Sequence, residues 1–87
     1  MKELQIYKGH EQEVNTICWH PKVEDIFCSA GADGCIIFWN ASDNKNFVIK
    51  NAHDKEIFDL SFNPIGNVLI SSGNDASLKV WQRNPLF

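Results

Sequence analysis

Two sets of serine, histidine and aspartate occur in this 87-residue chain at matching spacing, and these three residue types together can perform nucleophilic hydrolysis. In that chemistry the histidine removes the serine proton while the aspartate orients the histidine. A tryptophan follows six residues after each aspartate. The first set is His10, Ser29, Asp33 and Trp39, and the second set is His53, Ser71, Asp75 and Trp81.

The duplication favours a structural role for both sets. A single-domain enzyme rarely needs two triads, and neither Ser29 nor Ser71 lies in the G-x-S-x-G sequence of a nucleophile elbow. Polar turns that are pinned by buried, fully partnered hydrogen bonds would use the same residues. We therefore predict that the protein is not an enzyme and that it has no catalytic residues.

Both sets belong to an internal repeat. Residues 9–40 align with residues 52–82, and the phrase SAGADGCIIFW corresponds to SSGNDASLKVW. The offset is 43 residues as far as Pro21 and 42 residues from Ser29 onward, so the first copy has one extra residue between them. A length change of this kind points to a surface turn, and a repeat of this length indicates an array of structural units.

Short runs of β-forming residues, separated by turn signals, fill both copies. No window shows a helical period, so we predict an all-β chain with eight strands in an antiparallel meander. Several runs are apolar on both faces, which indicates that each sheet is covered on both sides. The predicted strands are residues 4–7, 14–19, 26–30, 35–39, 47–50, 57–62, 68–72 and 78–81.

The pattern resembles the WD40 repeat. Its features are a histidine near the start, usually after glycine, an aspartate in a turn and a tryptophan that ends the third strand. The sequence departs from the usual pattern at Asn40 and Gln82, which follow the tryptophans, at Ala52 before the second histidine, and at Ala76 after Asp75. The resemblance implies four-stranded antiparallel β-propeller blades, with a buried hydrogen-bond chain from Asp through His and Ser to Trp in each repeat.

The chain divides into a leading outer strand, two repeats and a tail. Residues 1–8 would complete another blade, residues 9–51 form the first repeat, residues 52–82 form a second repeat without its outer strand, and residues 83–87 are the tail. Propellers contain about four to eight blades, and repeat arrays usually need at least about three units for stability. We expect an incomplete propeller that is either a fragment or a homo-oligomer, completed by further blades in cis or in trans.

A closer likeness concerns the stretches KGHEQEVNTICWHP, AHDKEIFDLSFNPIGN and WQRNP. They are similar to the last two repeats of the WD-repeat subunit family of the pre-mRNA cleavage and polyadenylation machinery. This resemblance implies a nuclear scaffold that binds protein subunits of a larger complex and contacts RNA only indirectly. Two alternatives remain open: direct RNA binding, and a WD40 scaffold outside RNA processing.

Charge patterning weighs against nucleic-acid and membrane binding. The formal net charge is −3, and the eight Lys and Arg residues are scattered along the chain. Concentrated basic charge would be expected of either kind of surface. Turns at one rim should carry the interaction surface, and their acidic character favours basic peptides. The candidate rim residues are Glu11, Glu13, Asp54, Lys55, Glu56 and Asn74.

The three cysteines, Cys18, Cys28 and Cys35, form no C-x-x-C pair. We expect them to be reduced thiols in an intracellular protein. Cys18 and His20 are the nearest metal-ligand pair, but their spacing differs from that of zinc sites, so we predict neither a metal nor a cofactor. The first ten residues lack a signal-peptide core, and no stretch is long enough for a membrane span.

Overall fold

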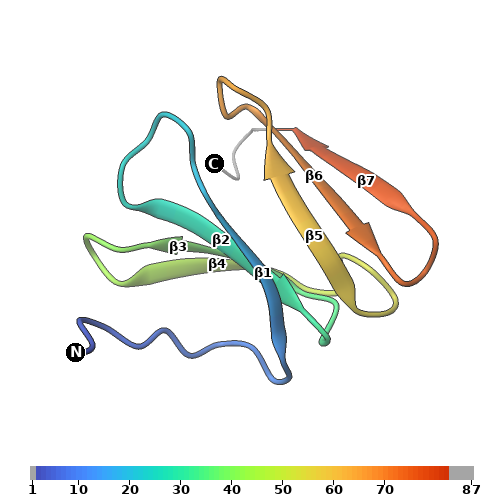
Figure 1. The fold of residues 1–87 in the computed structure, drawn as a ribbon, viewed down its shortest axis with the longest axis horizontal. Coiled ribbons are helices and arrows are strands. Elements are labelled where there is room, and N and C mark those ends of the chain that lie inside the picture. Colours follow the sequence, from blue (N-terminus) through green and yellow to red (C-terminus); the bar gives the residue numbers. More distant parts are fainter. Residues whose placement is uncertain (1, 83–87) are drawn as a thin grey trace.

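The computed structural model describes residues 2–82, which form two antiparallel sheets (Figure 1). In each sheet the spatial order follows the chain order, so consecutive strands are joined as hairpins. The predicted all-β antiparallel architecture is confirmed. The first sheet contains β1 (Val14–Trp19), β2 (Ile26–Gly31), β3 (Ile36–Asn40) and β4 (Lys45–Ile49), and the second contains β5 (Ile57–Phe62), β6 (Val68–Gly73) and β7 (Leu78–Gln82).

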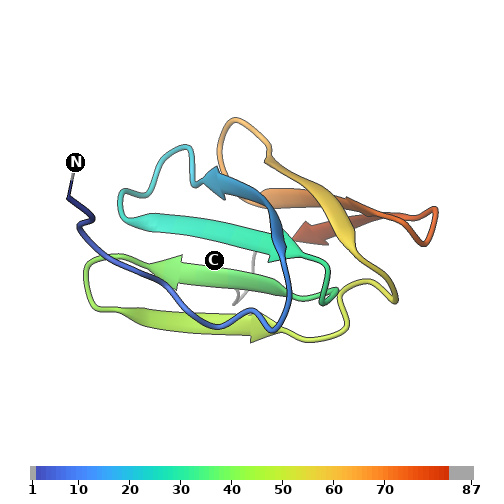
Figure 2. The same ribbon diagram turned by 60° about the horizontal axis from the view of Figure 1, so that its bottom comes forward.

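Residues 4–7 form no strand, so the prediction of eight strands is wrong and the described residues contain seven. The segment crosses one face of the first sheet instead (Figure 2), where the Tyr7 ring packs edge-on against Phe27 and Trp39 at centroid distances of 5.1 and 5.3 Å. A strand needs a ladder partner for its backbone N–H and C=O groups. Residues 4–7 pair with none of the edge strands β1, β4, β5 and β7.

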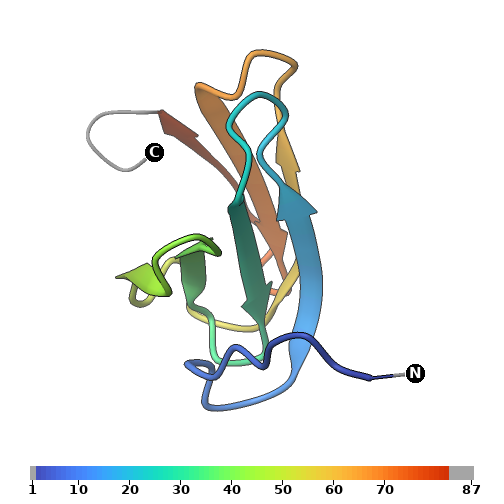
Figure 3. The same ribbon diagram turned by 90° about the vertical axis from the view of Figure 1, so that its left-hand side faces the viewer.

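The two sheets pack against each other through one side of each. β1 lies beside β5 where the sheets converge, and the sheets diverge toward β4 and β7 (Figures 1 and 3). Alternate residues of each strand point into this interface, as the two-residue period of a strand requires. The core cluster between the sheets consists of Cys28, Ala30, Ile36, Phe38, Ala52, Ile57, Leu60 and Leu69.

The outer side of each sheet has no neighbouring sheet within the described residues. Ile17 and Trp19 are exposed on the first sheet, and Leu78 and Val80 are exposed on the second. Within residues 2–82 there is also no helix long and apolar enough to span a membrane. The architecture therefore consists of two stacked blades whose outer sides keep exposed apolar residues, although Tyr7 covers Phe27 and Trp39 on the outer side of the first sheet.

The turns after β2 and β6 occupy the same position in the two repeats but carry different residues. Gly34 has a φ of 73°, and a Cβ atom at this position would clash with the carbonyl oxygen of His53. Ala76, the equivalent residue, adopts nearly the same backbone conformation with a φ of 63°. A left-handed conformation costs a non-glycine residue about 1–2 kcal/mol, so the second turn is strained where the first is not.

We expect opposite substitutions at these two positions to have unequal effects. Gly34→Ala should lower the free energy of unfolding by more than about 1 kcal/mol, because it adds both backbone strain and a steric clash. Ala76→Gly should leave it unchanged or raise it by up to about 1 kcal/mol. Urea unfolding of both variants measures this, and an equal loss in both would contradict the assigned turn geometry.

Candidate functional site

The first predicted set forms a continuous chain of hydrogen bonds. The indole Nε1–H of Trp39 donates to Ser29 Oγ at 2.8 Å, and His10 Nε2 lies 2.7 Å from the same oxygen. His10 Nδ1 lies 3.0 Å from Asp33 Oδ2. Because an ionised carboxylate can only accept, Nδ1 carries the proton and Nε2 accepts the hydroxyl hydrogen of Ser29.

The second set repeats this arrangement and adds the hydroxyl of Ser77, which lies 3.1 Å from His53 Nδ1. Trp81 Nε1 donates to Ser71 Oγ at 2.9 Å, His53 Nε2 lies 2.8 Å from that oxygen, and His53 Nδ1 lies 3.1 Å from Asp75. The hydroxyl of Ser77 also donates to Asp75 at 2.6 Å. The structure thus brings together all four members of both predicted sets.

Each aspartate joins two turns through backbone hydrogen bonds. Asp33 accepts the backbone N–H of Glu11 and of Cys35, both at 3.1 Å, and so links the segment before β1 to the turn between β2 and β3. Asp75 accepts the corresponding N–H groups of Asp54 at 3.3 Å and Ser77 at 3.1 Å. Both blades therefore have the same pair of turns fixed by one carboxylate.

The hydrogen bonds favour the ionised form of Asp75 and lower the pKa of its carboxyl group. The hydroxyl of Ser77 has the largest effect, burial opposes it, and His53 and the backbone N–H groups of Ser77 and Asp54 add to the lowering.

Asp33 has the same kind of shift with a different balance of causes. Burial, the largest influence, acts to raise its pKa, but the N–H of Cys35, the ring of His10 and the N–H of Glu11 together outweigh it, so the pKa is lowered. Among the residues that contact the two aspartates, the first repeat has Cys35 at the position that Ser77 occupies in the second repeat. The thiol of Cys35 donates to the backbone oxygen of Asp33 at 3.7 Å and leaves the carboxylate without a hydroxyl partner of this kind.

This order of groups is also that of a hydrolase triad, so the accessibility of the serine oxygen matters. A substrate carbonyl must come within about 3 Å of the nucleophile and of an oxyanion donor. Ser71 is 0% exposed and Ser29 is 4% exposed, and in both sets a tryptophan N–H already occupies the oxygen. The arrangement is suited to holding turns and leaves no approach for a substrate to the serine.

The predicted rim residues lie on the turns at the same end of the two sheets (Figure 1). Backbone hydrogen bonds fix these turns: Ala32 N–H donates to the oxygen of Glu13 at 2.8 Å, and Asn74 N–H donates to that of Glu56 at 2.9 Å. The side chain of Glu56 is partly engaged, because the Asn15 amide lies 3.4 Å from its Oε2. The exposed members are Glu11, Glu13, Asp54, Lys55 and Asn74.

Sequence reasoning missed the role of His20, which joins the two blades at the opposite end. Its Nδ1 accepts the backbone N–H of Lys22 at 3.1 Å and Val23 at 2.9 Å, so its Nε2–H donates to the oxygen of Gly66 at 3.0 Å. Both ring nitrogens are thereby used. The equivalent residue in the second repeat is Asn63, whose side-chain oxygen accepts the N–H groups of Gly66 and Val68 in its own turn. A polar residue before the proline in both repeats was the only sequence feature that pointed to a turn-capping role.

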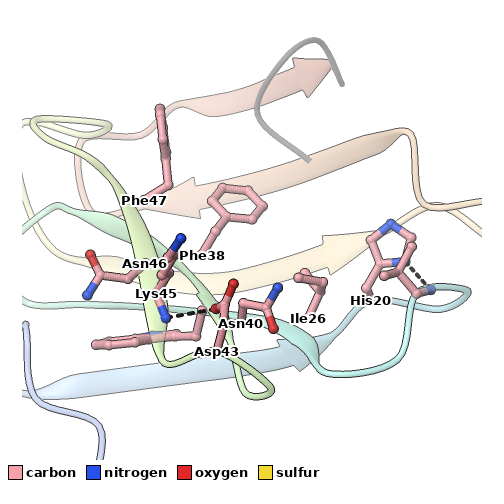
Figure 4. Close-up of a pocket in the computed structure, with 10 residues that line it drawn as sticks. His20, Ile26, Phe38, Asn40, Asp43, Lys45, Asn46 and Phe47 are labelled. Atoms are coloured by element: carbon pink, nitrogen blue, oxygen red, sulfur yellow. Dashed lines mark hydrogen bonds between the residues drawn. The ribbon is translucent and has the colours of Figure 1, made fainter.

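His20 also borders a hollow of about 340 Å³ whose lining residues all belong to the first repeat (Figure 4). Phe38 and Phe47 form apolar walls, while Asp43 and Lys45 lie at the β3–β4 turn. Phe47 on β4 is 46% exposed, because the second sheet has no fourth strand opposite β4 among the described residues. The hollow therefore lies at the β3–β4 end of the first blade.

Two of the three thiols lie together across β1 and β2. Cys18 Sγ is 3.3 Å from Cys28 Sγ, and their hydrogen bond lowers the pKa of Cys18 and, together with burial, raises that of Cys28. All three cysteines are free thiols. No cluster of three or more His, Cys, Asp or Glu side chains suited to a metal ion occurs in residues 2–82.

These stacked antiparallel blades, with a Trp–Ser–His–Asp chain in each, define a pair of WD-repeat blades. Residues 1–40 and 44–82 match the family model described as "WD domain, G-beta repeat", so the chain belongs to the WD40 family. The crystal structure of the RRP9 WD40 repeats superposes with a TM-score of 0.84 at 20% sequence identity, over 90% of this chain and 25% of that chain. This likeness confirms the fold as part of a propeller.

Several curated relatives have similar levels of identity. Polyadenylation factor subunit 2 of Saccharomyces cerevisiae is 35% identical over 86 residues, covering 95% of this chain and 18% of the relative. WD-40 repeat-containing protein MSI3 of Arabidopsis thaliana is 31% identical over 87 residues, covering 99% and 20%. Polycomb protein esc of Drosophila melanogaster is 33% identical over 81 residues, covering 90% and 19%. The chain thus spans about one fifth of the length of these relatives.

Removing a serine hydroxyl should destabilise the blade that contains it. In Ser71→Ala, His53 and Trp81 each lose a buried hydrogen-bond partner, which costs about 1–3 kcal/mol for each unsatisfied group. We expect a loss of at least about 1 kcal/mol in urea unfolding, against less than about 0.5 kcal/mol for Ser61→Ala, an exposed position of β5. Equal effects of the two substitutions would contradict the assigned role.

The two aspartates should make stability depend on acid pH. Their pKa values in the folded protein lie below the ordinary 3.8, so the unfolded chain binds more protons in acid. The stabilisation is present above that value and is lost as the pH falls toward the folded-state pKa values. We expect Asp75→Asn to show a smaller loss of unfolding free energy between about pH 5 and pH 2 than the unmodified protein.

Urea unfolding at a series of pH values measures this, with Asp25→Asn, in an exposed turn, as the control. The control should retain the acid dependence of the unmodified chain. An Asp75→Asn variant that loses as much stability in acid as the control would show that the carboxylate of Asp75 does not carry the effect.

Proposed function

We propose that this chain is a non-enzymatic protein-interaction module of the WD40 family that acts in pre-mRNA 3′-end cleavage and polyadenylation in the nucleus. The observation that carries the scaffold role is the pair of buried hydrogen-bond sets, which hold the turns of one rim on rigid sheets. The observation that supports the RNA-processing role is the 35% identity with polyadenylation factor subunit 2 over 95% of this chain.

In this proposal the two sets are structural clamps and the rim turns supply the binding chemistry. Glu11 and Glu13 precede β1, Asp54 precedes β5, and all three are exposed carboxylates at one end of the blades. Exposed acidic side chains on rigid turns attract basic peptide segments and repel the phosphates of RNA. The partners would be protein subunits of a larger complex, with RNA bound by those subunits.

The complete propeller would contain further blades, supplied in cis or in trans. Residues 9–51 would form one complete blade, and residues 52–82 would form a blade that receives its outer strand from elsewhere. Residues 1–8 would supply that kind of strand to another blade. A propeller completed in this way would present the rim of this chain as one sector of a larger binding surface.

A WD40 scaffold outside RNA processing is the second candidate. The 33% identity with Polycomb protein esc and the 31% identity with MSI3 are close to the value for the polyadenylation factor. Affinity purification of the tagged full-length protein from nuclei distinguishes the two. Recovery of cleavage and polyadenylation subunits, lost on joint Glu11→Lys and Glu13→Lys substitution, would support the first candidate, and their absence from the purified material would contradict it.

Direct RNA binding can be tested on the 87-residue chain itself. We expect A-rich RNA to bind weakly in a filter assay, with a dissociation constant no tighter than the roughly 10⁻⁴ to 10⁻⁶ M typical of non-specific nucleic-acid contacts. The comparison uses Trp19→Ala, which removes an exposed aromatic ring three residues before Lys22 in the sequence. Tight, salt-sensitive binding that Trp19→Ala abolishes would contradict the scaffold assignment in favour of an RNA-binding surface.

A further inference from the structure

We propose that the outer side of the second sheet and the free edge of β7 bind a second copy of this chain. The bound copy would contribute the outer side of its first sheet and its residues 2–6. This self-assembly is independent of the proposed role in RNA processing. It follows from a comparison of the uncovered sides of the blades with the interface that the chain already forms.

The outer side of the second sheet corresponds to a side that is buried in the first. Leu78 and Val80 are 73% and 67% exposed. At an offset of 42 residues their equivalents are Ile36 and Phe38, which are 0% and 5% exposed in the interface between the sheets. The same strand positions are therefore buried wherever a neighbouring blade is present.

The outer side of the first sheet corresponds in turn to the buried side of the second. Ile17 and Trp19 are 63% and 64% exposed, and their equivalents at an offset of 43 residues are Leu60 and Phe62. Leu60 belongs to the core between the sheets, and Phe62 packs against that core. The exposed apolar residues of the two outer sides thus belong to the two complementary halves of one interface, and head-to-tail stacking of copies would bury both.

The edge of β7 has a predicted partner with a defined register. In the complete first blade, Phe47 of β4 lies opposite Phe38 and Ile49 lies opposite Ile36. The repeat offset of 43 residues places Leu4 at the position of Phe47 and Ile6 at that of Ile49.

Pairing of residues 2–6 with β7 would then set Leu4 opposite Val80 and Ile6 opposite Leu78. These four apolar residues occupy one face of the joined strands and are all exposed in the single chain. Cross-strand apolar pairs of this kind stabilise a sheet by about 0.2–1 kcal/mol each.

The opposite face of the joined strands is complementary in charge and polarity. In the same register, Gln5 lies opposite Lys79 and Glu3 lies diagonal to it, so an acidic side chain is within reach of the ammonium group. The hollow beside β4 carries both Lys45 and Asp43, so it adds no net charge to this match. The donated strand would bring the carboxylate of Glu3 within reach of Lys79.

The segment that would pair with β7 lies on the side where the copy would bind. Residues 3–5 and Tyr7 lie over the outer side of the first sheet, near Trp19 and Phe27. A copy that docks its second sheet on this side must displace residues 3–5 from it and brings the edge of its β7 to the displaced segment. Face packing and strand pairing would therefore form in one contact between two chains, once the segment has left the face of its own sheet.

The contact joins different surfaces on the two copies, so it repeats from copy to copy and produces either a closed ring or an open filament. Each copy adds two blades. Rings of about three or four copies would contain six or eight blades, within the usual range of propellers.

Light scattering on the purified 87-residue protein across a concentration series tests the assembly. We expect oligomers of at least three copies that dissociate on dilution. Val80→Lys should reduce the species to a monomer with an unchanged circular dichroism spectrum, because Val80 is exposed in the single chain. Ile65→Lys is the matched control, since Ile65 is equally exposed, at 63%, but lies in the turn before β6. A monomer at all concentrations, or assembly of Val80→Lys like the control, would overturn the proposal.

Disulfide trapping between differently labelled chains tests the register. A Leu4→Cys chain mixed with a Val80→Cys chain should form a cross-link identified by peptide mapping. Leu4→Cys mixed with Leu78→Cys is the off-register control and should give at least about tenfold less, because its residues lie diagonally across the ladder. Equal yields from both mixtures would overturn the strand pairing. Either failure leaves the purification test of the RNA-processing role unaffected.

Discussion

The chain of hydrogen bonds from tryptophan through serine and histidine to aspartate is the interaction on which both blades depend. It places four polar side chains of each repeat where water is largely excluded, and such groups are tolerated only when each has a partner. The structure meets this condition, because no buried side-chain nitrogen or oxygen among the described residues lacks a hydrogen bond. The chain also converts a local motif into long-range order, since His53 and Asp75 are 22 residues apart.

The hydrogen bonds to the aspartate differ between the two repeats, and so does the backbone of the turn that follows it. Ser77 gives Asp75 a hydroxyl donor that Asp33 does not have, whereas the first repeat has Gly34 where the second has the strained Ala76. The turn of the second repeat therefore has one more hydrogen-bond donor to its aspartate, whereas the turn of the first repeat has the less strained backbone. Small differences of this kind show how two copies of one unit can diverge in sequence and still hold the same pair of turns.

Much of this could be predicted from the sequence because the decisive signals are local. β1 and β5 have the predicted bounds, since His20-Pro21 and Asn63-Pro64 end their ladders, and the spacing of Ser71, Asp75 and Trp81 within one hairpin is enough to identify a set. Residues 4–7 have the composition of a strand but form none, because pairing depends on an edge that is not adjacent in the chain. The link from His20 to Gly66 was missed for a similar reason: it crosses between blades, and no local pattern encodes it.

Hydrogen exchange of the three indole N–H groups, followed by NMR, tests the central claim most directly. Trp39 and Trp81 donate to buried serine oxygens, while the side chain of Trp19 is 64% exposed. The account predicts slow exchange for the first two indoles and fast exchange for the third. Similar rates for all three would contradict the claim that buried hydrogen-bond chains hold the blades together.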